Sequence, residues 1–291
     1  MVRGLCIYFV GLLGMGALAS QSADAAALHP PPSVQAGQAF VIQTEGSGEG
    51  TFYLLGPGSA MKRTVQLGSD VSIAADEVTT AGRYQAIICA ANDCTHTAFD
   101  VVSGPPARVS FFLHPSRVPV STPNVIDGTA FVFDRYYNPV LHPAKVDFQI
   151  APVSGAPFSR VGESERGVAW VRLGSSGKEG PLRVTADIGS AKEPRVIQQV
   201  AAEACHLRVK ATPGKRGVVF ETDPVRDCSG NPLPDGTIVS FTKVDASGMT
   251  TVDTPIKKGI ALTELPVKGN ARVTVACGVV LGNELSVAGN R

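Results

Sequence analysis

Short runs of alternating apolar and polar residues recur along the chain after residue 25. Each run is bounded by Gly, Pro, Asn or Asp, and no sustained apolar period of 3.6 residues accompanies them. A period of two places one face of a β-strand in a core and the other in water. The clearest runs lie at 108–113, 145–150, 182–187, 206–211 and 272–277. Many such strands separated by turns predict an all-β protein made of sandwiches or barrels.

The second half of the sequence contains an internal repeat of about 92 residues. An Asp-x-x-x-Asn-Pro pattern begins at Asp134 and again at Asp227. Gly-x-Ala and Arg-Val-Thr patterns follow each copy in the same order, with nearly equal gaps. Because a repeat of this length is a module in its own right, we infer two copies of one domain.

Segments rich in Pro or Ala separate the predicted domains. Ser-Gly-Pro-Pro at 103–106 is expected to be extended, since each proline disfavours a helical residue before it. Ala-Ala-Glu-Ala at 201–204 lies between the two copies of the repeat. We therefore predict domains at residues 27–103, 107–200 and 204–291.

The first 25 residues have the pattern of a secretory signal peptide. Arg3 precedes an apolar run from Cys6 to Ala19, and Ala-x-Ala cleavage patterns follow. The run is shorter than the roughly 20 residues of a spanning helix, although an uncleaved anchor is the alternative interpretation. We predict a cleaved signal peptide at 1–25 and no membrane span in the mature chain. The predicted location is the periplasm, the cell surface or the extracellular space.

Charge and composition remove several classes of function. Lys and Arg number 26 against 25 Asp and Glu, which gives a net charge of +1. Such a balance offers no electrostatic footprint for nucleic acid or an anionic membrane. Hydrophobic residues make up 44% of the chain, which argues for packed cores and against disorder.

The last predicted domain carries an ordered set of turn and strand motifs. Asp-x-x-Gly-Asn-Pro at 227–232 is followed by Val-x-Phe at 239–241, Gly-x-Ala at 259–261 and Arg-Val-Thr-Val at 272–275. This order resembles the bacterial immunoglobulin-like domain of the invasin/intimin type (group 1). The resemblance implies tandem immunoglobulin-like β-sandwiches. Because known members serve as stalks and adhesive modules on bacterial surfaces, it also implies a structural or binding role.

The resemblance extends to the domain at 107–200 and is weakest for 27–103. In the first domain, Ala-Gly-x-Tyr84 opens a predicted strand that also contains Cys89. This is typical of an immunoglobulin-like F strand, whose tyrosine bonds back to the backbone.

Five cysteines follow the signal peptide, and exported proteins form disulfides. Cys89 and Cys94 flank a predicted hairpin turn and are expected to pair. In an immunoglobulin-like sandwich, Cys205, Cys228 and Cys277 are expected near the same end. One disulfide is expected among these three, with Cys228 to Cys277 as the preferred pairing and the other pairings open.

Aromatic residues supply the candidate binding site. Tyr136 and Tyr137, with His142 nearby, are expected to form a patch on a loop, and Trp170 falls on the polar side of its strand. Exposed aromatics anchor protein partners, and on sandwich loops they stack on sugars. The alternatives are that the tyrosines cover a domain junction and that Trp170 packs against a neighbouring domain.

Catalytic and metal-binding motifs are missing from the sequence. Gly-x-Ser-x-Gly, His-Glu-x-x-His and Cys-x-x-Cys do not occur. We predict an exported non-enzymatic module, without cofactor or metal, that binds a protein or spaces other parts. The alternative is a carbohydrate-binding accessory protein, so the expected partner is a protein or a cell-surface glycan. A hydrolase in the first domain is a third hypothesis, which requires His96 and Asp93 to share a pocket.

Overall fold

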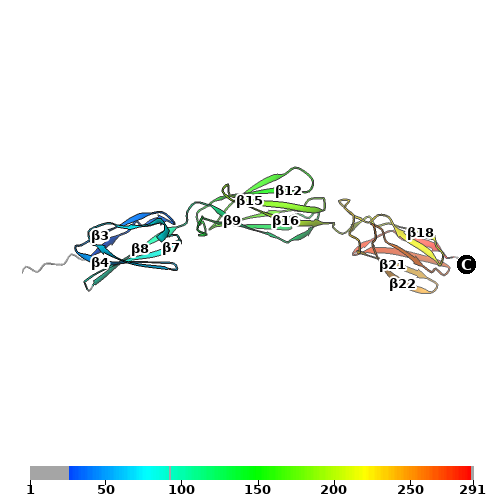
Figure 1. The fold of residues 1–291 in the computed structure, drawn as a ribbon. Helices are drawn as coiled ribbons and strands as arrows, with labels where there is room; N and C mark the ends of the chain where they lie inside the picture. The colour runs from blue at the N-terminus through cyan, green and yellow to red at the C-terminus, as the bar shows by residue number, and fades with distance from the viewer. Residues whose placement is uncertain (1–25, 92, 290–291) are drawn as a thin grey trace, which may run out of the picture. The chain divides into compact units, whose positions relative to one another are not determined.

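The computed structural model describes residues 26–91 and 93–289. Within these ranges the chain is all-β, with a single short 3-10 turn, η1 (Ala75–Glu77), which confirms the predicted fold class (Figure 1). None of the helical turns described there is long and apolar enough to cross a membrane. The predicted signal peptide at 1–25 lies outside the described residues.

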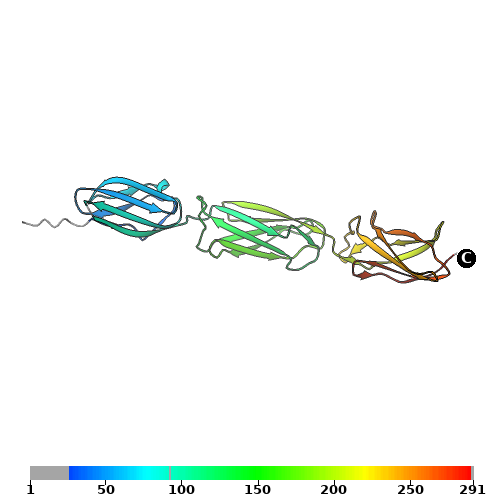
Figure 2. The ribbon, with the colours of Figure 1, turned by 90° about the horizontal axis from the view of Figure 1, so that it is seen from below.

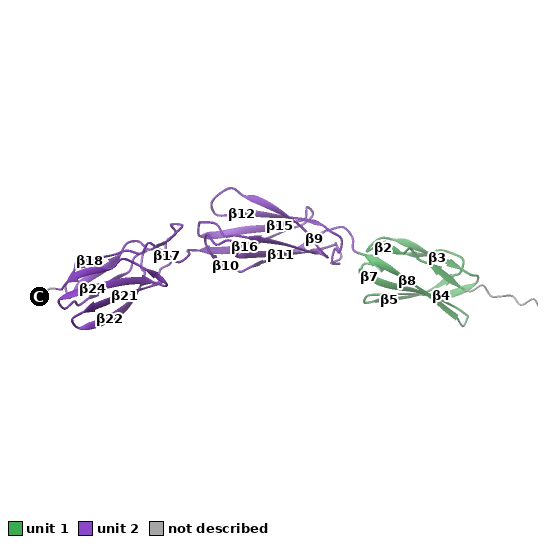
Figure 3. Cartoon of the chain, turned by 180° about the vertical axis from the view of Figure 1, so that it is seen from behind, with its two compact units in different colours: residues 1–102 green, residues 103–291 purple. Residues whose placement is uncertain are grey.

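The chain divides into two compact units, residues 1–102 and residues 103–291 (Figure 3). The first unit has two sheets, ordered β1-β3-β6 and β2-β8-β7-β4-β5. Strand β2 runs parallel to β8, and the other pairs are antiparallel. The strands are β1 (Ala27–His29), β2 (Ser33–Gln35), β3 (Phe40–Glu45), β4 (Glu49–Gly56), β5 (Ser59–Gln66), β6 (Val71–Ile73), β7 (Gly82–Ala90) and β8 (Asp93–Val102).

Tyr84 anchors the core of the first unit. Its side chain is buried and its hydroxyl donates a hydrogen bond to the carbonyl of Thr80 at 3.0 Å. The predicted backbone bond of this tyrosine is therefore confirmed. Gly56 is required beside it, because a Cβ there would lie 2.0 Å from the Tyr84 ring.

Replacing Tyr84 with Phe is expected to destabilise the first unit by about 1 kcal/mol, because the hydrogen bond from the buried Tyr84 side chain to the Thr80 carbonyl is lost while the ring packing is kept. Hydrogen exchange of peptides from residues 26–102 measures the change. Tyr53→Phe is the control, since that side chain lies on the outer face of the same sheet and is only partly buried. Equal protection in both variants would contradict the expected role of the hydroxyl.

The second unit contains two hydrophobic cores, and the layered strands around each are visible in Figure 2. We call these the second and third sandwiches. The division at 107–200 and 204–291 remains a prediction. The second sandwich has sheets ordered β10-β16-β15-β12-β13 and β14-β11-β9. Its strands are β9 (Arg108–His114), β10 (Arg117–Pro119), β11 (Ile126–Phe133), β12 (Lys145–Ala151), β13 (Phe158–Glu163), β14 (Val168–Leu173), β15 (Gly180–Asp187) and β16 (Lys192–Val200).

The third sandwich has sheets ordered β17-β20, β18-β19-β23 and β22-β21-β24-β25, with β26 also paired to β24. Its strands are β17 (Ala204–Cys205), β18 (Val209–Pro213), β19 (Val218–Thr222), β20 (Arg226–Asp227), β21 (Ile238–Asp245), β22 (Gly248–Pro255), β23 (Leu262–Leu265), β24 (Asn270–Cys277), β25 (Val280–Leu281) and β26 (Leu285–Ala288).

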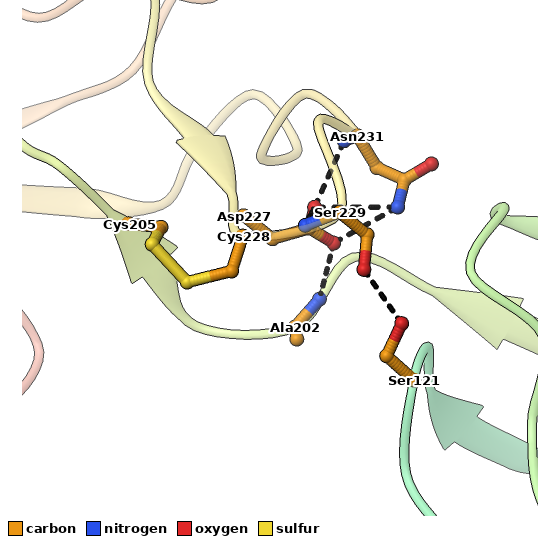
Figure 4. Close-up of a disulfide and its surroundings, with 7 residues drawn as sticks. All are labelled: Ser121, Ala202, Cys205, Asp227, Cys228, Ser229 and Asn231. Carbon is orange, nitrogen blue, oxygen red and sulfur yellow. Dashed lines mark hydrogen bonds between the residues drawn. A yellow bond between two sulfur atoms is a disulfide. The ribbon is translucent and has the colours of Figure 1, made fainter.

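The repeated aspartates form the same hydrogen-bond network in both sandwiches. In the third, Asp227 Oδ1 accepts the amides of Ser229 and Asn231, each at 2.9 Å, while Oδ2 accepts Asn231 Nδ2 and the Ala202 amide, each at 3.0 Å (Figure 4). Ala202 belongs to the connecting segment 201–204. The aspartate thus ties the turn to the chain that enters the sandwich.

In the second sandwich, Asp134 Oδ1 accepts the amides of Tyr136 and Asn138, and Oδ2 accepts Asn138 Nδ2 and the Gly104 amide. Gly104 belongs to the Pro-rich segment 103–106. Burial alone raises the pKa of such a carboxyl, but the four donors outweigh it. The pKa of Asp134 therefore lies below its ordinary value of 3.8.

Two disulfides join cysteines of the described residues. Cys89 and Cys94 face each other across β7 and β8 and are bonded, as predicted. The preferred pairing of Cys228 with Cys277 is wrong, because Cys205 is bonded to Cys228 (Figure 4). Pairing of β17 with β20 places Cys205 opposite Arg226, close to Cys228, whereas Cys277 ends β24 facing the core and is a buried thiol.

The second and third sandwiches are joined by side-chain contacts as well as by the chain. The hydroxyls of Ser121 and Ser229 lie 2.6 Å apart (Figure 4). Asn231 accepts a hydrogen bond from the Glu179 amide at 3.2 Å and donates one to the Gly177 carbonyl at 2.9 Å. The turn built around Asp227 therefore also contacts the loops of the preceding sandwich.

Candidate functional site

The three-stranded sheet β14-β11-β9 has an unusual outer face. Its inner face is ordinary, since Phe111, Ala130 and Val171 belong to the core of the second sandwich. Across the strands, Thr129 of β11 lies opposite Trp170 of β14 and opposite Phe112 of β9. Two large aromatic residues therefore flank a threonine in one row on the outer face.

These aromatic side chains are substantially exposed. Trp170 is 68% exposed, Phe112 49% and Phe131 36%. The rings of Phe112 and Phe131 meet edge to face, with their centroids 5.9 Å apart. Together the three side chains leave about 300 Å² of aromatic surface in water, given the usual size of these rings. We name this surface, formed by Phe112, Phe131 and Trp170, the aromatic face.

One end of the aromatic face is bordered by an ion pair. Arg172 and Asp127 lie opposite each other in the next row, and Arg172 Nε donates to Asp127 Oδ1 at 2.6 Å. The hydrogen bond that Arg172 donates to Asp127, and the negative charge of Asp127, both raise the pKa of Arg172. The pair therefore presents donors and acceptors beside Trp170 while its two charges neutralise each other.

The other end of the aromatic face leads to Tyr137. Arg108, opposite Phe133 in the last row of the sheet, donates to the Tyr137 hydroxyl at 3.0 Å and places its guanidinium 4.4 Å from the ring centroid. The rings of Phe133 and Tyr137 are 6.4 Å apart. Tyr137 has a φ of 68°, which the turn around Asp134 imposes. The turn thereby brings Tyr137 to the end of the sheet.

The remaining candidate residues lie apart from this surface. Tyr136 is half-buried, and its ring is covered by the guanidinium of Arg135 at 4.6 Å. His142 is exposed on the following loop, and within the described ranges no hydrogen bond joins it to either tyrosine. The structure therefore brings Tyr137 close to the sheet that carries Trp170, and does not bring Tyr136 or His142 to the aromatic face.

Sequence reasoning missed Phe112 and Phe131. Both lie at polar positions of strands in which apolar and polar residues alternate. For Phe112, in the run at 108–113, this position could have been recognised from the sequence. Their proximity to Trp170 depends on β11 lying between β9 and β14, which the alternation alone does not specify.

The first unit carries a separate hollow on the outer face of its larger sheet. It has a volume of about 590 Å³ and is lined by Tyr53, Leu55, Gln85, Ile87, Cys89, Cys94 and His96. His96 therefore lines this hollow without Asp93. The pair that the hydrolase hypothesis requires is not assembled there. In the described part of the chain, no three His, Cys, Asp or Glu side chains are grouped as metal ligands.

No protein-family model matches the sequence, and no curated protein is significantly similar to it. Solved structures do match. FdeC, an Escherichia coli adhesin, aligns over 91% of this chain and 96% of its own, with 14% identity and a TM-score of 0.60. Invasin, a bacterial integrin-binding protein, aligns over 91% of this chain with 11% identity and a TM-score of 0.51, and this chain spans 59% of the invasin chain. The chain thus has the fold of tandem immunoglobulin-like domains of bacterial adhesins of the invasin type.

Proposed function

We propose that the chain is an exported, non-enzymatic, adhesin-like protein that holds a partner at a cell surface through the aromatic face. The observation that carries this proposal is the row of Trp170 and Phe112 on the wet side of a folded sheet. Contiguous exposed apolar surface of this kind marks interaction sites. The fold shared with FdeC and invasin, an adhesin and an integrin-binding protein, supports the same class of role.

Export is part of the proposal. The predicted signal peptide at 1–25 and the two disulfides both support a location outside the cytoplasm, because disulfides persist in oxidising compartments. The periplasm, the cell surface and the extracellular space all meet this condition.

Replacing Trp170 and Phe112 together with Ala is expected to reduce retention of the purified chain on intact bacterial or epithelial cells by at least about tenfold, because exposed aromatic anchors carry most of an interface's binding energy. Retention is measured by flow cytometry with fluorescently labelled protein. Met249→Ala is the control, since Met249 is exposed on the third sandwich. Equal retention of all variants would overturn the role of the aromatic face.

Spacing is a second candidate function. The bonds from Asn231 to Glu179 and Gly177, together with the contact between Ser121 and Ser229, favour it because they restrict motion between the second and third sandwiches. A chain that serves only as a spacer would show no retention on cells that depends on Trp170.

A further inference from the structure

We propose that the aromatic face binds a neutral glycan, whose sugar rings stack on Trp170 and Phe112. The inference rests on the proposed function and names the class of ligand. A pyranose ring has an apolar face of C–H groups and a rim of hydroxyls, so its binding site needs exposed aromatic rings with polar groups beside them. Both kinds of group are present on the outer face of the sheet β14-β11-β9.

The spacing of the aromatic residues suits an extended chain of sugars. Trp170 and Phe112 are separated by one strand, so their backbones lie about 10 Å apart at the usual strand spacing. Thr129 lies between them, and its hydroxyl can donate or accept a hydrogen bond. A ligand crossing the strands meets a ring, a hydroxyl and a second ring in turn.

The polar groups around the rings can satisfy sugar hydroxyls. Arg172 supplies further donors and Asp127 acceptors in the row beside Trp170, and Ser110 lies opposite Phe131 on the other side. The Arg172–Asp127 pair is internally neutral, and Arg108 is engaged with Tyr137. This arrangement favours a neutral glycan over a sulfated or otherwise anionic one.

The polar group between the rings favours a glycan over a second copy of the chain or another protein. The energetic centre of a protein interface is a well-packed, fully desolvated pocket, whereas Thr129 places a hydroxyl between Trp170 and Phe112 on an exposed sheet. A short glycan can stack on both rings and form a hydrogen bond with the hydroxyl between them.

Trp170 is the only tryptophan in the sequence, so intrinsic fluorescence reports directly on the aromatic face. The full chain is titrated with neutral tetrasaccharides of glucose, galactose and N-acetylglucosamine. We expect at least one of them to shift Trp170 emission to shorter wavelength and to protect it from acrylamide quenching. The binding constant should change little with added salt, because no net charge is neutralised.

Phe112→Ala is the decisive variant, because it removes one stacking partner and keeps the reporter. We expect it to weaken binding of the tetrasaccharide about tenfold, Phe112→Tyr to bind as the native chain does, and Leu262→Ala, at an exposed site of the third sandwich, to have no effect. Near-UV circular dichroism confirms that each variant is folded.

The failures of the two proposals are distinguishable. If no tetrasaccharide changes Trp170 fluorescence while retention on cells still requires Trp170, the glycan inference is overturned and the binding role stands with a protein partner. A strong loss of binding with salt would overturn the neutral class of glycan. If retention on cells does not depend on Trp170, the proposed function itself fails.

Discussion

Removing both Cys205 and Cys228 by substitution with Ala is expected to destabilise the third sandwich by about 3 kcal/mol. The disulfide closes a loop with a sequence separation of 23 residues, and a cross-link of that span restricts the unfolded chain by about this amount. The Cys89–Cys94 bond spans only 5 residues and is expected to contribute about 2 kcal/mol to the first unit. The disulfide that closes the longer loop is therefore expected to contribute more to stability.

Cys277 provides the readout for this experiment. It is the unpaired cysteine among the described residues, it is 4% exposed, and burial raises the pKa of its thiol. A thiol reagent can react with it only when the third sandwich opens. A loss of about 3 kcal/mol corresponds to labelling of Cys277 about a hundredfold faster, in a chain that lacks residues 1–25 and so also lacks Cys6.

The control for this experiment is the removal of Cys89 and Cys94 together, which leaves Cys277 labelling unchanged because these residues belong to the first unit. Substituting both members of each pair avoids a free thiol that could exchange with Cys277. Unchanged labelling after removal of Cys205 and Cys228 would contradict the stabilising role of that bond.

The strands were predictable where burial alternates regularly. The runs at 108–113, 145–150 and 272–277 lie within β9, β12 and β24, each with one face in a core. The run at 206–211 was only partly correct, since β18 begins at Val209. His206 has a φ of 56°, which interrupts an extended strand, and a left-handed residue other than Gly leaves no mark in the apolar pattern.

The disulfide in the third sandwich was not predictable from periodicity. Strands β17 and β20 have two residues each, too few to show any alternation, and their pairing is what brings Cys205 to Cys228. Cys277, in contrast, ends the alternating run at 272–277 and faces the core from β24. A buried side chain on a core strand does not reach the turn, which is why it stays a thiol.

Of the aromatic face, only Trp170 was singled out from the sequence, and the surface as a whole was not predictable. The polar-side position of Trp170 left open whether it is exposed or packs against a neighbouring domain, and in the structure it is 68% exposed. Whether exposed aromatics gather depends on strand order and register, which are long-range properties of the fold. The position of β11 between β9 and β14 is what places Phe112 and Phe131 near Trp170.

Replacing Asp227 with Ala is expected to destabilise the third sandwich by about 3 kcal/mol or more. Asp227 is 3% exposed and accepts hydrogen bonds from three backbone amides and one side chain. Hydrogen bonds to a charged acceptor contribute about 1.5–3 kcal/mol each, and buried donors left without a partner are penalised further. Cys277 labelling again measures the loss.

The pH dependence of this contribution has a definite sign. Burial raises the pKa of Asp227, but hydrogen bonds from Asn231, Ala202 and Ser229 outweigh it, so the pKa in the folded chain lies below 3.8. As the pH falls, the unfolded chain, in which the pKa of Asp227 is higher, takes up the proton before the folded chain does. The contribution of Asp227 to stability is therefore full at neutral pH and is lost as the pH drops through the folded pKa. Asp227→Asn should be less stable at pH 7 and should lose less on acidification.

Asp134→Ala is the matched experiment in the second sandwich, because Asp134 makes the same four bonds with Gly104 in the place of Ala202. Trp170 fluorescence during urea unfolding reports on the second sandwich, and Cys277 labelling reports on the third. Each substitution should therefore affect mainly its own reporter. If Asp227→Ala lowers the Trp170 transition as strongly as Asp134→Ala does, the aspartates act through contacts between the sandwiches, not as independent ties within each one.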